Sequence, residues 1–282
     1  MTQLKKSLIK EKIAKTFIWI ATFLVIAVLA HVLLDILIKG LPLISWEFLT
    51  EVPRNMGRDG GISSTIIGTV LLTLVAVIIA VPFGIGTAFY LAEYAGDNTF
   101  TRIVRFSAES LAGIPSIVYG LFGFIFFVIG LNLGWSILSG GLTLAIMILP
   151  TIIRTSEEAI RSVPEAYRNV SYSLGASKWQ TIRKVVFPSA IQGITNGIIL
   201  SIGRSIAETA AVILTAGSAL RMPTSLFSPT RTMAVHFFIL AREGISMKNA
   251  YGTAALLIIL ILFINVFANM LVDRLMAKNK ER

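Results

Sequence analysis

Two ionisable residues, Arg204 and Glu208, lie inside an apolar stretch that runs from residue 190 to residue 217. Their spacing of four residues would place both side chains on one face of a helix, about one turn apart. A guanidinium presents a planar fork of donors that suits the oxygens of an oxyanion. Glu208 would hold that fork in place while no anion is bound. The pair therefore predicts an anion pathway through this stretch.

Two other interpretations of the pair stay open. The two residues would also serve as a structural ion pair that locks the helix to a neighbour. Alternatively, the apolar segment would cover residues 185–203 and leave both charges at its outer edge. We favour the pathway, because a charge at the centre of an apolar span costs roughly 2.5–3.5 kcal/mol and usually marks a functional position.

The polar stretch 154–189 is a second candidate site. Pro164 can begin a helix, and Glu165 then lies favourably in the first turn. Residues 165–174 predict a short helix, which Gly175 would end in the left-handed conformation.

A second short helix is expected to start near Ser177, before the chain returns to an apolar segment ahead of Pro188. Such a helix–Gly–helix projection fits a groove in a partner and transmits a push to the apolar segments on either side. A solvated connecting loop is the competing interpretation, because loops of this length are often but not always functional.

Other polar residues are weaker candidates. The chain has no cysteine, and its two histidines, His31 and His236, lie too far apart in sequence to suggest a metal site. Glu109, near the cytoplasmic end of the third apolar stretch, is expected to snorkel toward the membrane surface or to pair with Arg102 or Arg105. Four later basic residues are interpreted as a solvated loop, a contact surface for an acidic protein or an attraction for anions. They are Arg221, Arg231, Arg242 and Lys248.

The composition of the chain points to a membrane. Hydrophobic residues make up 55% and charged residues 14% of its 282 residues, and the mean hydropathy is +0.80. Soluble proteins carry about 25% charged residues. The net charge of +10 does not indicate a nucleic-acid partner, because the Lys and Arg residues fall between apolar runs. We expect an integral membrane protein surrounded by lipid.

Six apolar stretches are long enough, or nearly long enough, to cross a bilayer, which takes about 20 residues. They cover roughly residues 17–38, 62–92, 108–130, 137–153, 190–217 and 251–272. The first exceeds the length of a signal-peptide core and has no cleavage site, so we interpret it as an uncleaved span. With the N-terminus inside, cytoplasmic segments hold 17 of the 25 Lys and Arg residues and outside segments hold 7, which predicts two cytoplasmic termini.

These stretches divide the chain into three parts. Residues 1–61 form a cytoplasmic tail, a first span and an outside loop, and residues 62–275 form a core of five spans. Residues 276–282 form a second cytoplasmic tail. The second stretch contains Pro82 and is too long for a straight span, so we expect it to be kinked or tilted.

The polar stretch resembles the EAA loop of ABC importer permeases, whose pattern is Glu-Ala-Ala, three residues, Gly, nine residues and Ile-x-Leu-Pro. Gly175 and Pro188 stand at the required distance, and Val185 and Phe187 replace the Ile and the Leu. The Glu-Ala-Ala positions are occupied instead by Asn169, Val170 and Ser171. The acidic residue of the family pattern is therefore missing, while the Gly and the Pro that shape the loop are present.

Four further segments are similar to phosphate permeases of the PstA and PstC type, and their arrangement is closer to PstA. They are GGISSTIIGT (60–69), AGIPSIVYGLFG (112–123), LPTIIRTSEEA (149–159) and GRSIAET (203–209). The resemblance implies an all-α integral membrane protein with about six transmembrane helices and the type I ABC importer permease (MetI-like) fold. It also implies that Arg204 and Glu208 act in transport.

The resemblance further implies a permease for inorganic phosphate in the cell membrane. It would pair with a homologous PstC-like permease on a PstB-like ATPase dimer and receive the anion from an extracytoplasmic phosphate-binding protein. The residues implied to couple it to the ATPase are Glu165, Asn169, Gly175, Ala176 and Pro188. No G-x-x-x-x-G-K-[ST] sequence occurs, so we expect no cofactor on this chain and ATP on the partner. The alternatives are a permease for another oxyanion, such as molybdate or sulfate, and an ion-coupled anion transporter.

Overall fold

The computed structural model describes the backbone of residues 3–96 and 98–280, and the side chains of residues 10–96, 98–270 and 274. Its longer helices are α1 (Gln3–Gly40), α3 (Ser63–Phe89), α4 (Thr99–Ala112), α5 (Ser116–Gly123), α6 (Ile137–Arg161), α7 (Glu165–Ser173), α9 (Phe187–Ala207), α11 (Met233–Arg242) and α12 (Met247–Lys280). Its shorter helical segments are η1 (Leu41–Leu43), α2 (Trp46–Thr50), η2 (Asn55–Gly57), η3 (Tyr90–Tyr94), η4 (Phe124–Gly130), α8 (Lys178–Thr181), η5 (Ile182–Val186) and α10 (Ala210–Thr215). Within this described part, the only β pairing is an isolated bridge between Arg54 and Asp59.

Five helical stretches of the described part are long and apolar enough to cross a membrane. They are Lys10–Leu43, Ser63–Tyr94, Ile137–Arg161, Lys178–Ala207 and Met247–Met270. A sixth is obtained when the bent pair α4 and α5–η4 is counted as one span. The six apolar stretches of the sequence are thus confirmed as helical, although two of them have a different course from the one expected.

The third stretch is not a straight span. Between α4 and α5 the chain bends by 103°, at Gly113, Ile114 and Pro115. Proline cannot donate a backbone hydrogen bond and disfavours a helical conformation for the residue before it, which accounts for the break.

The fifth stretch is also interrupted. The helix begins at Lys178, inside the polar loop, and ends at Ala207, so the expected helix over residues 190–217 is wrong at its C-terminal end. Glu208 is extended, with ψ of 133°, and α10 follows as a separate short helix. No proline or glycine marks this break, which occurs where the chain turns to pack α10 against α5.

The core lies where α3 packs along α6. Leu72 and Ala76 of α3 and Leu144 and Ile148 of α6 are fully or almost fully buried there. Gly141 allows α6 to approach α3 closely, because an added Cβ would overlap the Val75 side chain. Without a hydrophobic force between helices in lipid, such close packing of small residues holds the spans together.

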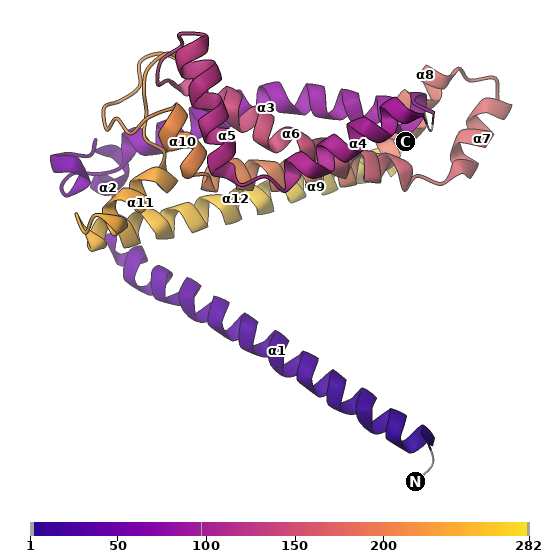
Figure 1. The fold of residues 1–282 in the computed structure, drawn as a ribbon, viewed down its shortest axis with the longest axis horizontal. Helices are drawn as coiled ribbons and strands as arrows, with labels where there is room; N and C mark the ends of the chain where they lie inside the picture. The colour runs from indigo at the N-terminus through magenta and orange to yellow at the C-terminus, as the bar shows by residue number, and fades with distance from the viewer. Residues whose placement is uncertain (1–2, 97, 281–282) are drawn as a thin grey trace.

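Helix α1 stands apart from the other helices and diverges from them toward its N-terminus (Figure 1). The apolar window of α1 is not buried at all. The C-terminal end of α1 meets the first turns of α12, where Gly40 lies against Tyr251 and Ala255. Here Lys39 forms a 2.7 Å ion pair with Asp35 and lies over the Tyr251 ring.

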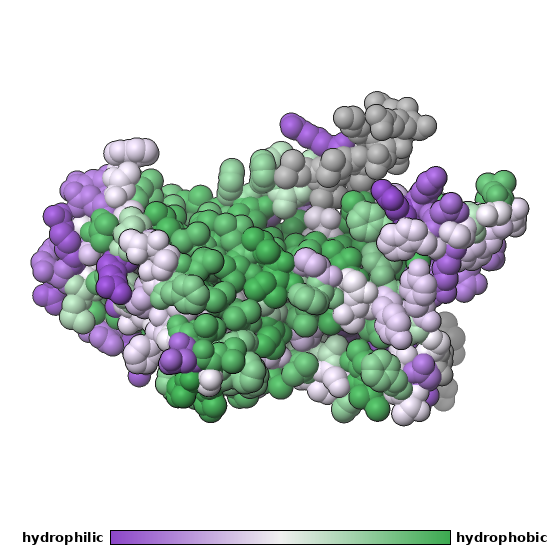
Figure 2. All heavy atoms as spheres, turned by 90° about the horizontal axis from the view of Figure 1, so that it is seen from above, coloured by the Kyte–Doolittle hydropathy of each residue, from purple (hydrophilic) through white to green (hydrophobic). Residues whose placement is uncertain are grey.

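The face of the molecule in Figure 2 is apolar in its middle and more polar at its two ends. One end carries α2 and α11, and the opposite end carries α7 and α8 (Figure 1). Both chain termini point toward the end that carries α7 (Figure 1). An apolar belt between two polar ends is the arrangement expected of a protein that spans a bilayer.

Candidate functional site

Arg204 and Glu208 do not form the pair that their spacing suggested. Arg204 lies in the last turn of α9, whereas Glu208 follows the end of that helix. The carboxylate of Glu208 accepts a hydrogen bond from the Ala211 amide at 3.2 Å, at the start of α10. Arg204 forms no ion pair or hydrogen bond with another residue of the described chain. The expectation that Glu208 holds the guanidinium of Arg204 is therefore wrong, because the helix ends between them.

Two helix breaks lie close to Arg204. One is the 103° bend between α4 and α5, and the other is the interruption between α9 and α10. Helices α5 and α10 pack directly on each other, since an added Cβ on Gly120 would overlap the Ala211 backbone. The Tyr119 hydroxyl donates to the Leu111 carbonyl across the first break, at 2.7 Å.

Among the described residues, the guanidinium of Arg204 has no hydrogen-bond or ion-pair partner at this junction. It is half-buried and lies in the last turn of α9, just before the break that separates α9 from α10. The position beside it, Gly203, faces open space. Non-helical backbone at membrane depth is tolerated where it is buried in protein or lines a water-filled path. A path past Arg204 at the junction of the two breaks stays a prediction.

The second candidate site is a projection that we call the coupling elbow, residues 165–181, formed by α7, a turn and α8. Gly175 has φ of 81°, so the predicted left-handed end of the first helix is confirmed. Ser177 starts α8 with a capping box. The Ser177 hydroxyl accepts a hydrogen bond from the backbone amide of Gln180, and the Gln180 side-chain oxygen accepts one from the backbone amide of Ser177. A hydrogen bond of 2.8 Å between the buried hydroxyls of Ser171 and Thr181 holds the two helices together.

The outer face of the elbow is exposed and partly apolar. Leu174 is 83% exposed and Val170 is 61% exposed. Glu165, Asn169 and Gly175 are also exposed. Large apolar side chains left in water commonly mark a protein contact surface.

The remaining predicted coupling residues have structural roles. The amide of half-buried Ala176 donates to the Ser171 carbonyl at 3.2 Å, which closes the turn after α7. Pro188 lies just after the π-helical segment η5, in a helix that continues without a break from Lys178 to Ala207. Proline removes one backbone hydrogen bond from a helix, and a π-helical turn beside it accommodates the change in pairing.

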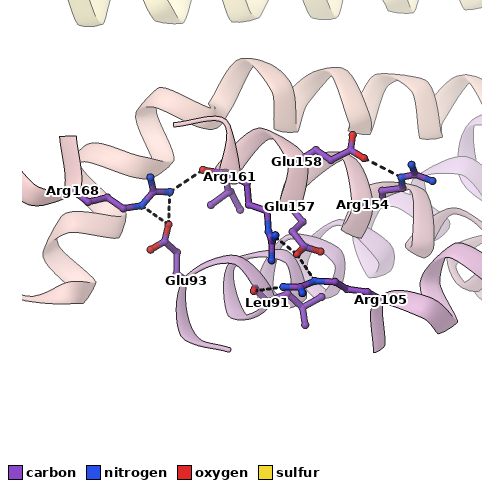
Figure 3. Close-up of polar contacts among 9 residues, drawn as sticks. Leu91, Glu93, Arg105, Arg154, Glu157, Glu158, Arg161 and Arg168 are labelled. Carbon is purple, nitrogen blue, oxygen red and sulfur yellow. Dashed lines mark hydrogen bonds and ion pairs between the residues drawn. The ribbon is translucent and has the colours of Figure 1, made fainter. Parts of the chain in front are cut away.

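One mostly buried ion pair ties the elbow to the segment after α3, and two partly buried pairs share Glu157 of α6; the sequence did not indicate these partners (Figure 3). Arg168 of α7 binds Glu93 of η3 with its Nη2 atom 2.7 Å from Oε1. Arg105 of α4 binds Glu157 of α6 at 2.8 Å, and Arg161 binds the same carboxylate at 3.0 Å. A charged residue at the end of an apolar stretch, such as Glu93, was the one available signal.

Arg105 pairs with Glu157 of α6, whereas the pairing considered from the sequence joined Glu109 to Arg102 or Arg105 of its own helix. Arg105 also donates to the Leu91 carbonyl at 3.1 Å, so its guanidinium reaches the segment that follows α3. Sequence spacing favoured Glu109, which is exposed, whereas the packing of α4 against α6 brings the more buried carboxylate of Glu157 to Arg105. The exposed fraction of the Glu157 side chain is only 11%.

At the opposite end of the molecule, Arg231 and His236 form a buried polar contact. Arg231 donates to the Ser218 carbonyl at 3.0 Å, and its Nη1 lies 3.4 Å from His236 Nδ1. Burial and, to a lesser extent, the charge of Arg231 lower the pKa of His236 from 6.5 to about 4. Arg231 is thus not part of a solvated loop as expected, since only 6% of it is exposed. The described residues contain no group of three potential His, Cys, Asp or Glu metal ligands.

Residues 80–280 match a protein family described as binding-protein-dependent transport system inner membrane component. The chain is 33% identical to the probable ABC transporter permease protein YqgI of Bacillus subtilis, over 93% of this chain and 95% of that protein. It is 33% identical to the phosphate transport system permease protein PstA of Mycobacterium leprae, over 92% and 87%. The PstA protein of Pasteurella multocida is 32% identical, over 92% and 93%.

The fold is also similar to solved structures. An inward-facing structure of the MetNI methionine ABC transporter superposes with a TM-score of 0.63 at 17% identity, over 76% of this chain and 95% of that chain. A bacterial ABC transporter that imports alginate superposes with a TM-score of 0.62 at 17% identity, over 96% of both chains. At this identity the likeness concerns the fold alone.

Proposed function

Because the chain belongs to the family of binding-protein-dependent transport system inner membrane components, we propose that it is the membrane-spanning permease subunit of an ATP-driven importer of inorganic phosphate. The observation that carries the phosphate assignment is the similarity to two PstA permeases over 92% of the chain. The all-α membrane fold of a MetI-like importer permease, expected from the sequence, is confirmed.

The proposed phosphate path passes Arg204. Its fork of donors lies at the junction of two helix breaks and has no competing ion pair in the described chain. A guanidinium binds phosphate oxygens in a bidentate manner. Glu208 contributes by holding the start of α10 against this junction, through its bond to the Ala211 amide.

The proposed driving force enters at the coupling elbow. An ATPase dimer of the PstB kind, which binds the ATP, would dock on the exposed face that includes Val170 and Leu174. Its closure moves the elbow, the spans rock, and the path near Arg204 opens to the other side of the membrane. The missing acid at Asn169 means that docking uses apolar contact and shape rather than a salt bridge from that position.

The remaining proposed partners complete an importer. A second, PstC-like permease would lie beside this one, and an extracytoplasmic phosphate-binding protein would deliver the anion at the end that carries α2 and α11. The chain would sit in the cell membrane with both termini in the cytoplasm. Two features support this orientation: the bias of Lys and Arg residues, and the position of the termini toward the end that carries α7 (Figure 1).

The proposal is tested in vesicles that contain this chain with its candidate partner permease, ATPase and binding protein. We expect uptake of radioactive phosphate when ATP is inside the vesicle and none when a non-hydrolysable analogue replaces it. Uptake with the analogue and an ion gradient would instead favour an ion-coupled transporter.

The substrate is tested in the same vesicles by competition. An excess of unlabelled phosphate should stop the uptake, while an equal excess of sulfate or molybdate should leave it unchanged. If sulfate or molybdate competes and is itself imported, the chain belongs to a permease for that oxyanion.

A further inference from the structure

The contact between Arg168 and Glu93 is the best-shielded ion pair of the described chain. The Nη2 and Nε atoms of Arg168 both donate to Oε1 of Glu93, at 2.7 and 3.0 Å. The exposed fraction is 15% for the Arg168 side chain and 5% for that of Glu93. The two residues are 75 positions apart, so the contact joins the elbow to the segment that follows α3.

The same guanidinium also binds the end of α6. Its Nη1 donates to the Val163 carbonyl at 2.6 Å, and its Nη2 donates to the Ile160 carbonyl at 2.9 Å. The last carbonyls of a helix have no partner within it, and a basic side chain can satisfy them. One side chain therefore connects α7, α6 and η3, which are three different parts of the chain (Figure 3).

The most extensive other contacts of α7 in the described chain are with its neighbours in sequence. It contacts α8 and η5, and its outer face is exposed. The adjacent residue, Asn169, carries no charge. Its backbone carbonyl accepts a hydrogen bond from the Ser173 hydroxyl at 2.9 Å, which lies within α7. Arg168 thus supplies the charged connection between this helix and the spans.

We infer that Arg168 is a positioning residue that makes α3 and α6 move together with the coupling elbow. The inference rests on the proposed function, in which the elbow is moved by an ATPase. Without this contact, the elbow would be free to tilt at its turns and the spans would receive only part of the movement. A planar guanidinium can hold three acceptors at fixed angles, which a lysine ammonium on its flexible stem does less well.

Movement of α3 and α6 can reach the helix breaks through direct contacts between neighbouring helices. Gly84 of α3 lies directly against Ile152 of α6, so these spans have little room to slide. Arg105 fixes α4 to Glu157 of α6, and α4 leads into the bend that precedes α5. The proposed route to the neighbourhood of Arg204 is therefore a continuous series of contacts.

The test uses the complete reconstituted importer with Arg168→Lys, which keeps the charge and removes the fork. ATP hydrolysis and phosphate uptake are measured in the same vesicles. We expect the ATPase to co-purify and to hydrolyse ATP, while the ATP used per phosphate imported rises about tenfold, since hydrogen bonds to a charged group are lost. An unchanged ratio would overturn the inference. A purely structural role would lower assembly without raising this ratio.

Arg154→Gln serves as the matched control, because Arg154 forms an exposed pair with Glu158, in which the side chains are 57% and 65% exposed. Its ratio should equal that of the unmodified importer. Phosphate uptake by the unmodified importer reports on the proposed function separately. If that uptake fails, the proposed function fails, whereas the ratio in the variant addresses Arg168 alone.

If the importer with Arg168→Lys does not assemble, a cysteine pair tests whether the elbow and the segment after α3 move together. The chain has no cysteine, so Glu93→Cys with Arg168→Cys gives two unique thiols. Before cross-linking we expect the raised ratio, and after bridging with a short thiol-specific linker we expect it to return toward the unmodified value. A ratio that bridging leaves raised, or hydrolysis that continues while bridging stops uptake, would show that the two sites do not move as a unit.

Discussion

The coupling elbow and the junction of the helix breaks use charged residues in opposite ways. Arg168 at the base of the elbow pairs with Glu93, and Arg105 of α4 pairs with Glu157 of α6; both carboxylates are mostly buried. At the junction, Arg204 is half-buried and has no ion pair within the described chain. Paired charges hold neighbouring helices in one arrangement, whereas an unpaired guanidinium keeps its donors for a ligand. The difference fits a stiff transmission at one site and substrate contact at the other.

The largest expected effect comes from removing the unpaired charge. Arg204→Gln should lower phosphate uptake by about 100-fold, because two charge-assisted hydrogen bonds of roughly 1.5 kcal/mol each are lost. Uptake is measured in reconstituted vesicles, and co-purification of the ATPase should be unchanged.

Arg183→Gln is a suitable control for that variant. Arg183 is exposed on η5, close to the elbow and outside the helix junction. Its loss should leave uptake within about twofold of the unmodified protein, as is usual for exposed charges. Normal uptake by Arg204→Gln would show that Arg204 is not part of the phosphate path.

A second variant tests the shape of the elbow. Gly175→Val places a β-branched residue at φ of 81°, which costs about 1–3 kcal/mol. The strain should distort the turn and weaken ATPase association about tenfold, measured as co-purification at increasing dilution. Gly86→Val is the matched control, because Gly86 faces open space and its φ is not positive. Unchanged association of the Gly175 variant would argue against docking at the elbow.

A third prediction concerns the end opposite the elbow, where Arg231 and His236 are buried together. The pKa of His236 is lowered to about 4 in the folded protein, while an unfolded histidine has about 6.5. The unfolded chain therefore binds a proton first as the pH falls. The contribution of this residue to stability is complete above pH 6.5 and should decrease by about 2 kcal/mol at pH 5.

Thermal unfolding in detergent at pH 7.5 and pH 5 checks this prediction. His236→Gln should make unfolding less sensitive to this change of pH, although it also lowers stability at both values. His31→Gln, at an exposed position of α1, should leave the pH dependence as it was. An equal pH dependence in the His236 variant and the unmodified protein would mean that His236 is not buried in its neutral form.

The smallest effect is expected for Glu208→Gln. Since Glu208 does not hold Arg204 and its oxygen bonds the Ala211 amide, a glutamine can make the same hydrogen bond. Uptake should stay within about twofold of the unmodified protein, as expected when a neutral acceptor replaces a charged one at a helix start. A loss as severe as that of Arg204→Gln would instead support a functional pair between these two residues.

Local features of the molecule could be predicted from the sequence because short-range physics determines them. Apolar runs of about 20 residues must become helices in a bilayer, since their backbone groups find no other partners there. Gly175 ends its helix in the left-handed conformation because a residue without a Cβ does so at little cost. Asn169 was likewise placed correctly on the elbow, whereas Pro188 lies within the helix that runs from Lys178 to Ala207 and not at its start. Their roles in coupling stay predictions.

The arrangement of the charges could not be predicted in this way. Spacing suggested that Arg204 pairs with Glu208 and that Arg105 has a partner within its own helix. Spacing along the sequence can indicate only contacts between residues that are close in the chain. The helix break after Ala207 and the choice of Glu157 by Arg105 depend on contacts between distant segments. Arg168 and Glu93 are 75 residues apart, and no local rule joins them.

The sequence by itself determined a membrane-spanning helical chain, a helix–Gly–helix elbow and the presence of an arginine in an apolar segment. The tertiary structure decided that Arg105 and Arg168 pair with mostly buried carboxylates, while Arg204 has no ion pair among the described residues. The physical reason is that helix formation in lipid depends on neighbouring residues along the chain. A buried charge is stabilised by whichever carboxylate the packing of distant helices brings within about 3 Å.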